Sequence, residues 1–299
     1  MTGDLNQYLH GKRSLVNAHL RTALHSAGGC PPSLMEAMSY SLLAPGKRLR
    51  PLLVILATKA CGGQDTVALP AASAVEMIHT YSLIHDDLPA MDDDDLRRGL
   101  PTCHKKFGEA MAILAGDALL TLAFQVLAES YPPATGAACC RELARGAGAA
   151  GMVGGQVEDL AWEKRGGTLA DLENVHALKT GALFRACLRL GIIVAQGERP
   201  EGPDPRLLEC LDAYGRCFGL AFQITDDLLD VESTAAQTGK RVQKDAERGK
   251  LTYPGFLGVA ESRKRAEELC RLAQEHLQPF GEAGGRLAAL AQFVVTRDR

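Results

Sequence analysis

Residues 81–92 read Tyr81-Ser82-Leu83-Ile84-His85-Asp86-Asp87-Leu88-Pro89-Ala90-Met91-Asp92. The residues before Asp86 belong to a largely apolar run that is typical of a buried helix. Pro89 cannot donate a backbone hydrogen bond to His85, so the helix must loosen or end between Asp86 and Asp92. The chain after Pro89 can then curl back, and we expect the Asp92 carboxylate to lie near that of Asp86.

A second acidic motif follows much later in the chain, Asp226-Asp227-Leu228-Leu229-Asp230. Asp226 and Asp230 are four residues apart, so they project from one face of a helix, one turn apart. The preceding residues 220–224 are too apolar for a solvent-exposed strip. A single acidic run is more often a solvated helix face, but two runs in such surroundings predict a binding site.

The charge of these motifs predicts what they bind. Two carboxylates 4 Å apart repel by roughly 4 kcal/mol at an effective dielectric near 20, so a folded protein keeps them together only in water or around cations. Oxygen ligands without a Cys or His pattern favour Mg²⁺, which completes its shell with water and substrate phosphates. The two motifs therefore predict a shared Mg²⁺ cluster and a phosphate ester as substrate.

The composition favours helices packed on helices. Hydrophobic residues make up 46% of the chain and aromatic residues only 5%, and few stretches alternate as strands do. Gly and Pro clusters separate apolar stretches at 52–60, 71–85, 110–128, 172–195, 207–231 and 262–277. No break resembles a linker, so we expect residues 1–299 to form a single domain. The net charge of −3 and the lack of a basic stretch interleaved with aromatics argue against nucleic-acid binding.

The cysteines and the apolar runs predict the compartment. Nine cysteines form neither a CxxC pair nor a zinc-binding spacing, which favours reduced thiols. The N-terminus has no apolar core of a signal peptide, and the longest uninterrupted apolar stretch, 52–57, is far shorter than a membrane span. We therefore expect a cytoplasmic protein without stable membrane insertion.

Basic residues accompany the acidic motifs. Three cations lie in the turn Gly46-Lys47-Arg48-Leu49-Arg50-Pro51, Arg97-Arg98 follow the first motif, and further Lys residues stand at 179, 240 and 250. Each alone is more often a solvated surface cation. Together with paired acidic motifs they predict diphosphate binding, because Arg forks match phosphate oxygens and Lys supplies a mobile point charge.

In order and spacing, these motifs resemble those of the bacterial farnesyl diphosphate synthases, short-chain members of the trans-polyprenyl diphosphate synthase family. The resemblance covers essentially the whole chain and includes His79-Thr80-Tyr81, Lys179-Thr180-Gly181, residues 222–230 and Gly249-Lys250-Leu251-Thr252-Tyr253-Pro254. It implies an all-α fold, a single large helical bundle around a central cavity, and a homodimer. The two aspartate motifs would face each other across the cavity mouth.

The resemblance also implies a role for each site residue. Up to three Mg²⁺ ions would be held by Asp86, Asp87, Asp92, Asp226 and Asp230. The allylic diphosphate would contact Arg97, Lys179, Thr180, Gln223 and Lys240, while Lys250 would help to close the site over it. Isopentenyl diphosphate would be held by Lys47, Arg50, His79 and Arg98.

The chemistry expected from these residues is ionisation, condensation and elimination. Divalent ions and cationic side chains stabilise charge on a leaving diphosphate, which generates an allylic carbocation. The double bond of isopentenyl diphosphate attacks the cation, and the departed diphosphate takes the proton. The Lys179 carbonyl, the Thr180 hydroxyl and the Gln223 amide can stabilise the cation by their dipoles. Water must be excluded by an apolar cavity and a closing loop.

Four alternatives are weighed against this reading. A class I terpene cyclase would not need a second diphosphate pocket, and an HD-type phosphohydrolase would need an upstream His pattern that is absent. An inactive subunit of a heteromeric prenyl synthase would normally have lost one aspartate motif. A geranylgeranyl diphosphate synthase is the nearest alternative, because it differs only in product length.

Product length is predicted from the residues just before the first motif. Ser82 is one turn before Asp86 and points down the same helix face, and Tyr81 is bulky enough to form part of a floor. The resemblance adds that these residues and the insertion Pro89-Ala90 set chain length in the bacterial enzymes. We therefore expect a fifteen-carbon product. The sequence leaves open whether Thr296-Arg297-Asp298-Arg299 reaches the site.

Overall fold

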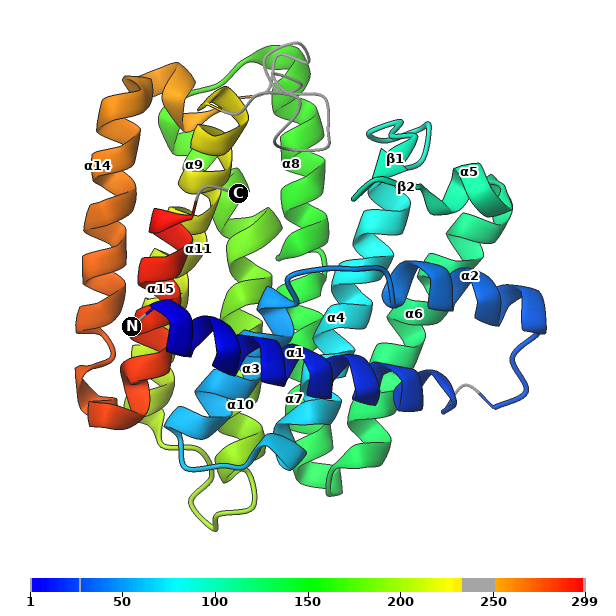
Figure 1. Ribbon diagram of the computed structural model, residues 1–299, viewed down its shortest axis with the longest axis horizontal. Helices are drawn as coiled ribbons and strands as arrows, with labels where there is room; N and C mark the ends of the chain where they lie inside the picture. The colour runs from blue at the N-terminus through cyan, green and yellow to red at the C-terminus, as the bar shows by residue number, and fades with distance from the viewer. Residues whose placement is uncertain (1, 27, 233–250, 298–299) are drawn as a thin grey trace.

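Helices follow one another along nearly the whole chain in the computed structural model, which describes residues 2–26, 28–232 and 251–297 (Figure 1). The predicted all-α fold is confirmed. The first half comprises α1 (Thr2–Leu24), α2 (Pro32–Leu42), α3 (Leu49–Ala60), α4 (Asp65–Asp86), the hairpin β1 (Leu96–Arg97) and β2 (Leu100–Pro101), α5 (Cys103–Phe107), α6 (Glu109–Ser130) and α7 (Pro133–Ala147). The second half comprises α8 (Met152–Arg165), α9 (Leu169–His176), a π-helix (Ala177–Gly181), α10 (Ala182–Gln196), α11 (Pro205–Glu232), α14 (Tyr253–Glu275), a 3₁₀ helix (Gln278–Gly284) and α15 (Gly285–Thr296).

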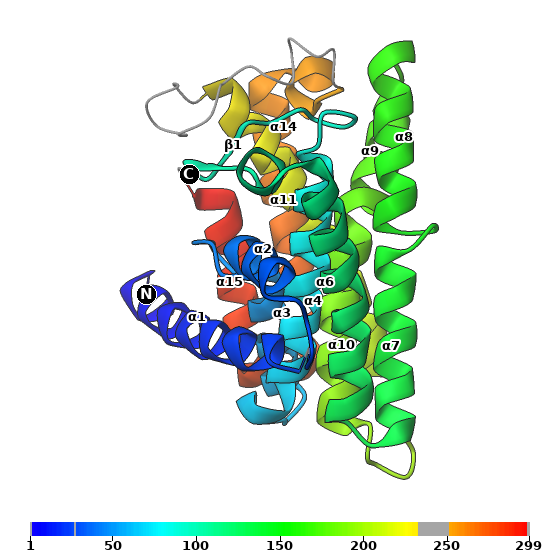
Figure 2. The ribbon, with the colours of Figure 1, turned by 90° about the vertical axis from the view of Figure 1, so that its right-hand side faces the viewer.

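The helices are stacked in layers. Seen from the side, α1 and α2 cover one face of the molecule, α7 and α8 form the opposite face, and α3, α4 and α10 lie between them (Figure 2). α3 is buried on every side from Pro51 to Thr58. It packs closely on α10, where an added Cβ at Gly191 would lie 2.5 Å from the Cβ of Ala57. This inner layer fixes the helices that carry the site.

The structure differs from the expected helices in ways that follow from local chemistry. α1, α2, α7 and α8 were not among the predicted apolar stretches, because polar residues separate their buried apolar residues along the sequence. The stretch 172–195 is helical, but the π-helix Ala177–Gly181 interrupts it. α4 begins at Asp65, before the predicted start, and accommodates Pro70 in its second turn.

Two helices, α4 and α6, are long and apolar enough to cross a membrane when judged by length and composition alone. The sequence expectation missed this because it considered uninterrupted apolar runs, whereas hydropathy averaged over a helix tolerates scattered polar residues. α4 is a core helix in which Val75, Met77 and Ile78 are fully buried. α6 is less buried and exposes Ile113 and Leu114, whose exposed fractions are 45% and 54%. A buried core helix passes the same test of length and composition, so two such helices are weak evidence for a membrane span.

Both aspartate motifs lie at the same end of the bundle. α4 ends at Asp86, directly before the first motif turns away, and α11 ends at Glu232, just after the second. In Figure 1 both of these helix ends point upward, on the side of the β1–β2 hairpin. The candidate site therefore lies at this end of the bundle.

Candidate active site at the ends of α4 and α11

The first aspartate motif forms a tight turn after α4. The Leu88 amide donates to the His85 carbonyl at 3.2 Å, and the Asp92 amide donates to the Asp86 carbonyl at 2.7 Å. Pro89 follows immediately after the last helical turn, as its missing N–H requires. The predicted return of Asp92 toward Asp86 is confirmed.

Asp86 lies in an environment that disfavours its charge. Burial raises the pKa of its carboxyl group to about 6, and the neighbouring Asp92 adds to the rise, while Lys179 and Arg97 oppose it. Burial and neighbouring carboxylates disfavour the charged form of such a group, so a bound cation stabilises it strongly. The described donor set is carboxylate oxygen, so its chemistry fits Mg²⁺.

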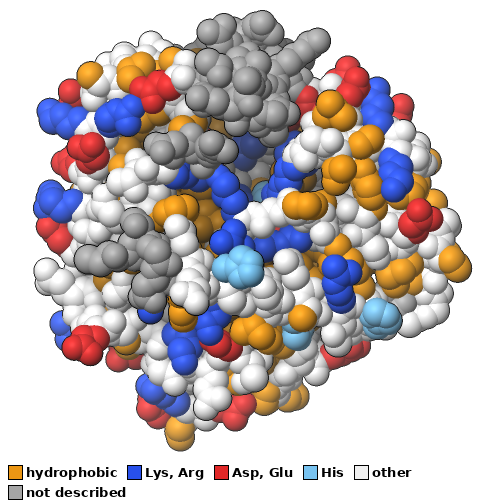
Figure 3. All heavy atoms as spheres, in the orientation of Figure 1, with side chains coloured by type: hydrophobic (Ala, Val, Ile, Leu, Met, Phe, Trp, Pro, Cys, Tyr) orange, Lys and Arg blue, Asp and Glu red, His pale blue; other side chains and the backbone are white. Residues whose placement is uncertain are grey.

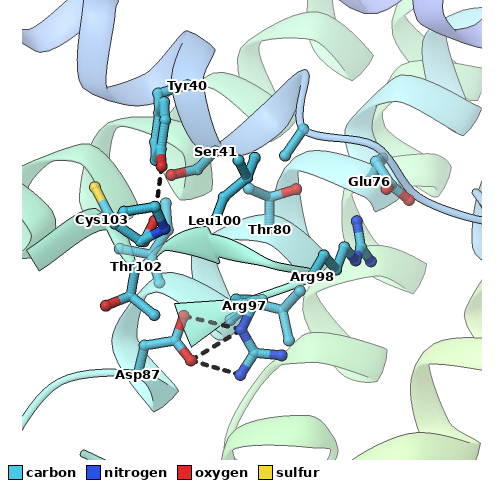
Figure 4. A pocket seen from close by; sticks show the side chains of 14 residues that line it. Tyr40, Ser41, Glu76, Thr80, Asp87, Arg97, Arg98, Leu100, Thr102 and Cys103 are labelled. Carbon is cyan, nitrogen blue, oxygen red and sulfur yellow. Dashed lines mark hydrogen bonds and ion pairs between the residues drawn. The ribbon is translucent and has the colours of Figure 1, made fainter. Parts of the chain in front are cut away.

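Asp87 is held by Arg97 of the β1–β2 hairpin. Arg97 Nε lies 2.8 Å and 2.9 Å from the two oxygens of Asp87, which is almost fully buried. Figure 4 shows this pair at one side of a pocket that Arg98 and Glu76 also line. Both oxygens of Asp87 thus accept from Arg97 in this structure, and its role as a metal ligand stays a prediction.

The second motif places its three carboxylates in different surroundings. Asp226 is exposed and forms an ion pair with Arg297, and Asp230, one turn on, is half-buried. Asp227 is buried and accepts a hydrogen bond from the Tyr253 amide at 2.9 Å, which joins α11 to the start of α14. The i, i+4 pair projects from one face of α11, as predicted, and Asp226 is its more exposed member.

A cationic pocket lies beside the second motif. Arg50 Nη1 is 3.2 Å from His79 Nε2, and the pKa of His79 lies well below its ordinary value because the ring is buried and faces Arg50. The imidazole is thus neutral, accepts from Arg50 and keeps its Nδ1–H for another partner. Lys47 belongs to the same group, since burial and the charges of Arg297 and Arg98 lower its pKa. Figure 3 shows a hollow on this face with Lys and Arg side chains gathered around it.

The third part of the site comes from the π-helix. Lys179 Nζ lies 2.6 Å from Asp159 Oδ2 on α8, and Thr180 is buried beside it. α11 packs against this segment so closely that an added Cβ at Gly219 would lie 3.1 Å from Gly181. Gln223 follows one turn later on α11 and is half-buried. π-Helical turns are rare and occur frequently at functional sites.

A profile of the polyprenyl synthetase family matches residues 31–280. The chain belongs to this family. A farnesyl diphosphate synthase of Escherichia coli (strain K12) is 49% identical over 89% of this chain and 90% of its own. A geranylgeranyl pyrophosphate synthase 7, chloroplastic, of Arabidopsis thaliana is 45% identical over 98% and 84%. The crystal structure of an FPP/GFPP synthase from Zymomonas mobilis is 38% identical, has a TM-score of 0.87 and is matched over 99% of this chain and all of its own.

Two residues of this polyprenyl synthetase were not foreseen as part of the site. Asp159 was missed because nothing in the sequence of α8 distinguishes it from the neighbouring acidic residue. Arg297, which the sequence left open, packs its guanidinium 4.3 Å from the ring of Phe222, and its side chain is only 4% exposed. Lys240 and Lys250 lie outside the described residues.

Proposed function

We propose that this polyprenyl synthetase is a prenyltransferase that condenses isopentenyl diphosphate with dimethylallyl diphosphate and then geranyl diphosphate to give (2E,6E)-farnesyl diphosphate. One observation carries the proposal: carboxylates at the ends of α4 and α11 border two separate sets of cations. Lys179 and Arg97 interact electrostatically with Asp86, whereas Lys47 and Arg50 interact electrostatically with Asp226. A terpene cyclase, which binds one diphosphate, would need only one such set.

The donor set fits Mg²⁺, and up to three ions would be held by Asp86, Asp92, Asp226 and Asp230, with Asp87 beside them. When bound, these ions would neutralise charge on the leaving diphosphate. Protein cations share this task at the allylic end, where Arg97, Lys179 and Lys240 would orient the same diphosphate. Lys250 would help to close the site.

The homoallylic substrate would occupy the pocket of Lys47, Arg50, His79 and Arg98. Because His79 is neutral and its Nε2 accepts from Arg50, its Nδ1–H is free to donate toward a diphosphate oxygen. The isopentenyl double bond would thereby be held close to the allylic carbon.

Dipoles near the π-helix would stabilise the allylic cation. The Thr180 hydroxyl, the Lys179 carbonyl and the Gln223 amide present oxygen atoms without placing a nucleophile that would trap the cation. The proton lost at the end would pass to the departed diphosphate, so the reaction needs no side-chain base.

We propose a fifteen-carbon product from the position of two α4 residues. Tyr81 is 7% exposed and its ring meets that of His85 edge to face at 5.7 Å. The short Ser82 side chain stays close to the helix, because its hydroxyl donates to the His79 carbonyl at 2.9 Å. A geranylgeranyl diphosphate synthase, with a twenty-carbon product, is the alternative.

We also propose a cytoplasmic homodimer, without stable membrane insertion and without nucleic acid as a partner. Ile113 and Leu114 on α6 are exposed apolar side chains that a second copy would cover. All nine cysteines are free, as a reducing compartment requires. Analytical ultracentrifugation of the wild type and of Leu114→Glu tests the dimer, since the substitution should yield monomers.

The test of the function is product analysis. Purified protein is incubated with Mg²⁺, dimethylallyl diphosphate and isopentenyl diphosphate, and the product is identified by chain length. A fifteen-carbon diphosphate supports the proposal, a twenty-carbon product favours the alternative, and no condensation product refutes both. Asp226→Ala should lose activity by several orders of magnitude, whereas Glu261→Gln on the exposed face of α14 serves as the matched control.

A further inference from the structure

A second group of possible metal ligands lies outside the site described above. Asp93, Asp95 and His104 each offer one ligand atom, and these atoms all lie within 4.8 Å of one another. The two aspartates follow the first aspartate motif, and His104 belongs to α5, on the other side of the β1–β2 hairpin. None of the three is among the predicted Mg²⁺ ligands.

His104 has an unused nitrogen. The ring is only 5% exposed, and its Nε2 is buried without a hydrogen-bond partner. Thr102 Oγ1 lies 2.8 Å from the Asp94 carbonyl, which can only accept, so the hydroxyl proton is committed there. At 3.2 Å from His104 Nδ1 the same hydroxyl must then accept, and Nδ1 carries the ring hydrogen. Nε2 is left with a buried lone pair, which is costly unless something binds it.

We propose that Asp93, Asp95 and His104 form a second metal site, which takes a zinc-class divalent ion such as Zn²⁺ or Co²⁺. An imidazole nitrogen with two carboxylates suits these ions, whereas Mg²⁺ prefers an oxygen-only set. Ligands of a tetrahedral zinc ion are about 3.3 Å apart. The two carboxylates therefore have to close in by up to about 1.5 Å, and both belong to exposed residues.

Lys105 is a present partner of Asp95 and a competitor that a metal ion would displace. Lys105 Nζ lies 2.8 Å from Asp95 Oδ1, and both side chains are largely exposed, at 44% and 71%. Exposed pairs of this kind are weak. The ion would join residue 95 to residue 104 across the hairpin that carries Arg97 and Arg98, and so would hold these two cations in place.

Calorimetric titration of metal-stripped protein with Zn²⁺, in a large excess of Mg²⁺ and without diphosphate, tests the proposal. The wild type should bind one Zn²⁺. His104→Asn can still donate to Thr102 but lacks Nε2. It should therefore bind Zn²⁺ at least about 100-fold more weakly, because loss of a residue that only supports a metal ligand already costs about 10–100-fold in affinity. Lys105→Gln, which removes the competitor without touching a ligand, should bind more tightly.

Two further variants keep the test decisive. Asp95→Asn changes an exposed side chain, so it reports on the site even if His104→Asn does not fold, and it should also weaken Zn²⁺ binding. Asp226→Ala alters the other carboxylate cluster and should leave Zn²⁺ affinity unchanged. The proposal fails if wild-type affinity survives in Asp95→Asn, or if Asp226→Ala abolishes binding, because the ion would then sit in the aspartate motifs. No activity is measured, so this outcome is independent of the proposed reaction.

Discussion

Replacing Asp86 by Asn should stabilise the metal-free protein while it abolishes activity. Burial, strengthened by the nearby Asp92 and opposed by Lys179, raises the pKa of Asp86 from 3.8 to about 6. Keeping this group ionised at neutral pH therefore costs the fold about 3 kcal/mol. In a chain of 299 residues the neutral Asn should raise Tm by about 5 °C.

The stability difference between Asp86→Asn and the wild type should depend on pH. Because the folded pKa lies above the unfolded one, the folded state binds the proton more tightly, and the wild type loses stability as the pH rises from about 4 to about 6. The advantage of Asp86→Asn should be nearly complete above about pH 6.5, about half as large at pH 5 and below about 1 kcal/mol at pH 4.

Thermal or urea unfolding of protein treated with a chelator measures the difference at each pH. Glu261→Gln, on the exposed face of α14, controls for the loss of any one negative charge. With Mg²⁺ and an unreactive allylic diphosphate the wild type should melt at the higher temperature, since only the wild type keeps the Asp86 carboxylate as a metal ligand. If Asp86→Asn melts no higher than the wild type at pH 7.5 without metal, Asp86 is not an electrostatically disfavoured carboxylate and the reasoning is wrong.

Four further outcomes are expected. Gly155→Ala should destabilise the fold by about 1–3 kcal/mol in urea unfolding, because its Cβ would lie 2.1 Å from the Lys179 amide nitrogen, whereas Gly11→Ala, with nothing within 4 Å, should not. Product analysis should show longer chains for Tyr81→Ala and shorter ones for Ser82→Phe; unchanged fifteen-carbon products from both would place the floor elsewhere. In steady-state kinetics Arg50→Ala should raise KM for isopentenyl diphosphate and Lys240→Ala that for the allylic substrate; an increase for the same substrate in both contradicts the two pockets. Arg297→Ala should tighten Mg²⁺ binding without diphosphate a few-fold in calorimetry, because Asp226 loses a competing partner.

The parts of the fold that were predictable are those with a local cause. Pro89 marks the end of α4, because a missing N–H acts within one helical turn. The apolar stretches that became α3, α4, α6 and α11 have enough buried residues to reveal their period. The π-helix at Ala177–Gly181 has no such mark, and the helices that approach it closely, α8 and α11, are separate elements of the chain.

The sequence predicted which residues line the candidate site, but not which side chains contact one another within it. The sequence placed Asp87 among carboxylates, yet its hydrogen bonds to Arg97 depend on how the hairpin folds back. Asp159 reaches Lys179 from another helix, and Arg297 reaches Asp226 from the end of the chain. Such pairings depend on tertiary packing, so spacing along the chain cannot reveal them.

The contact between Arg297 and Asp226 makes the end of the chain part of the site. Arg297 is the third residue from the C-terminus. α15 ends at Thr296, so Arg297 comes directly after it, and a shift of α15 along α11 would draw this cation away from Asp226. An affinity tag fused after residue 299 would extend the segment that carries this contact.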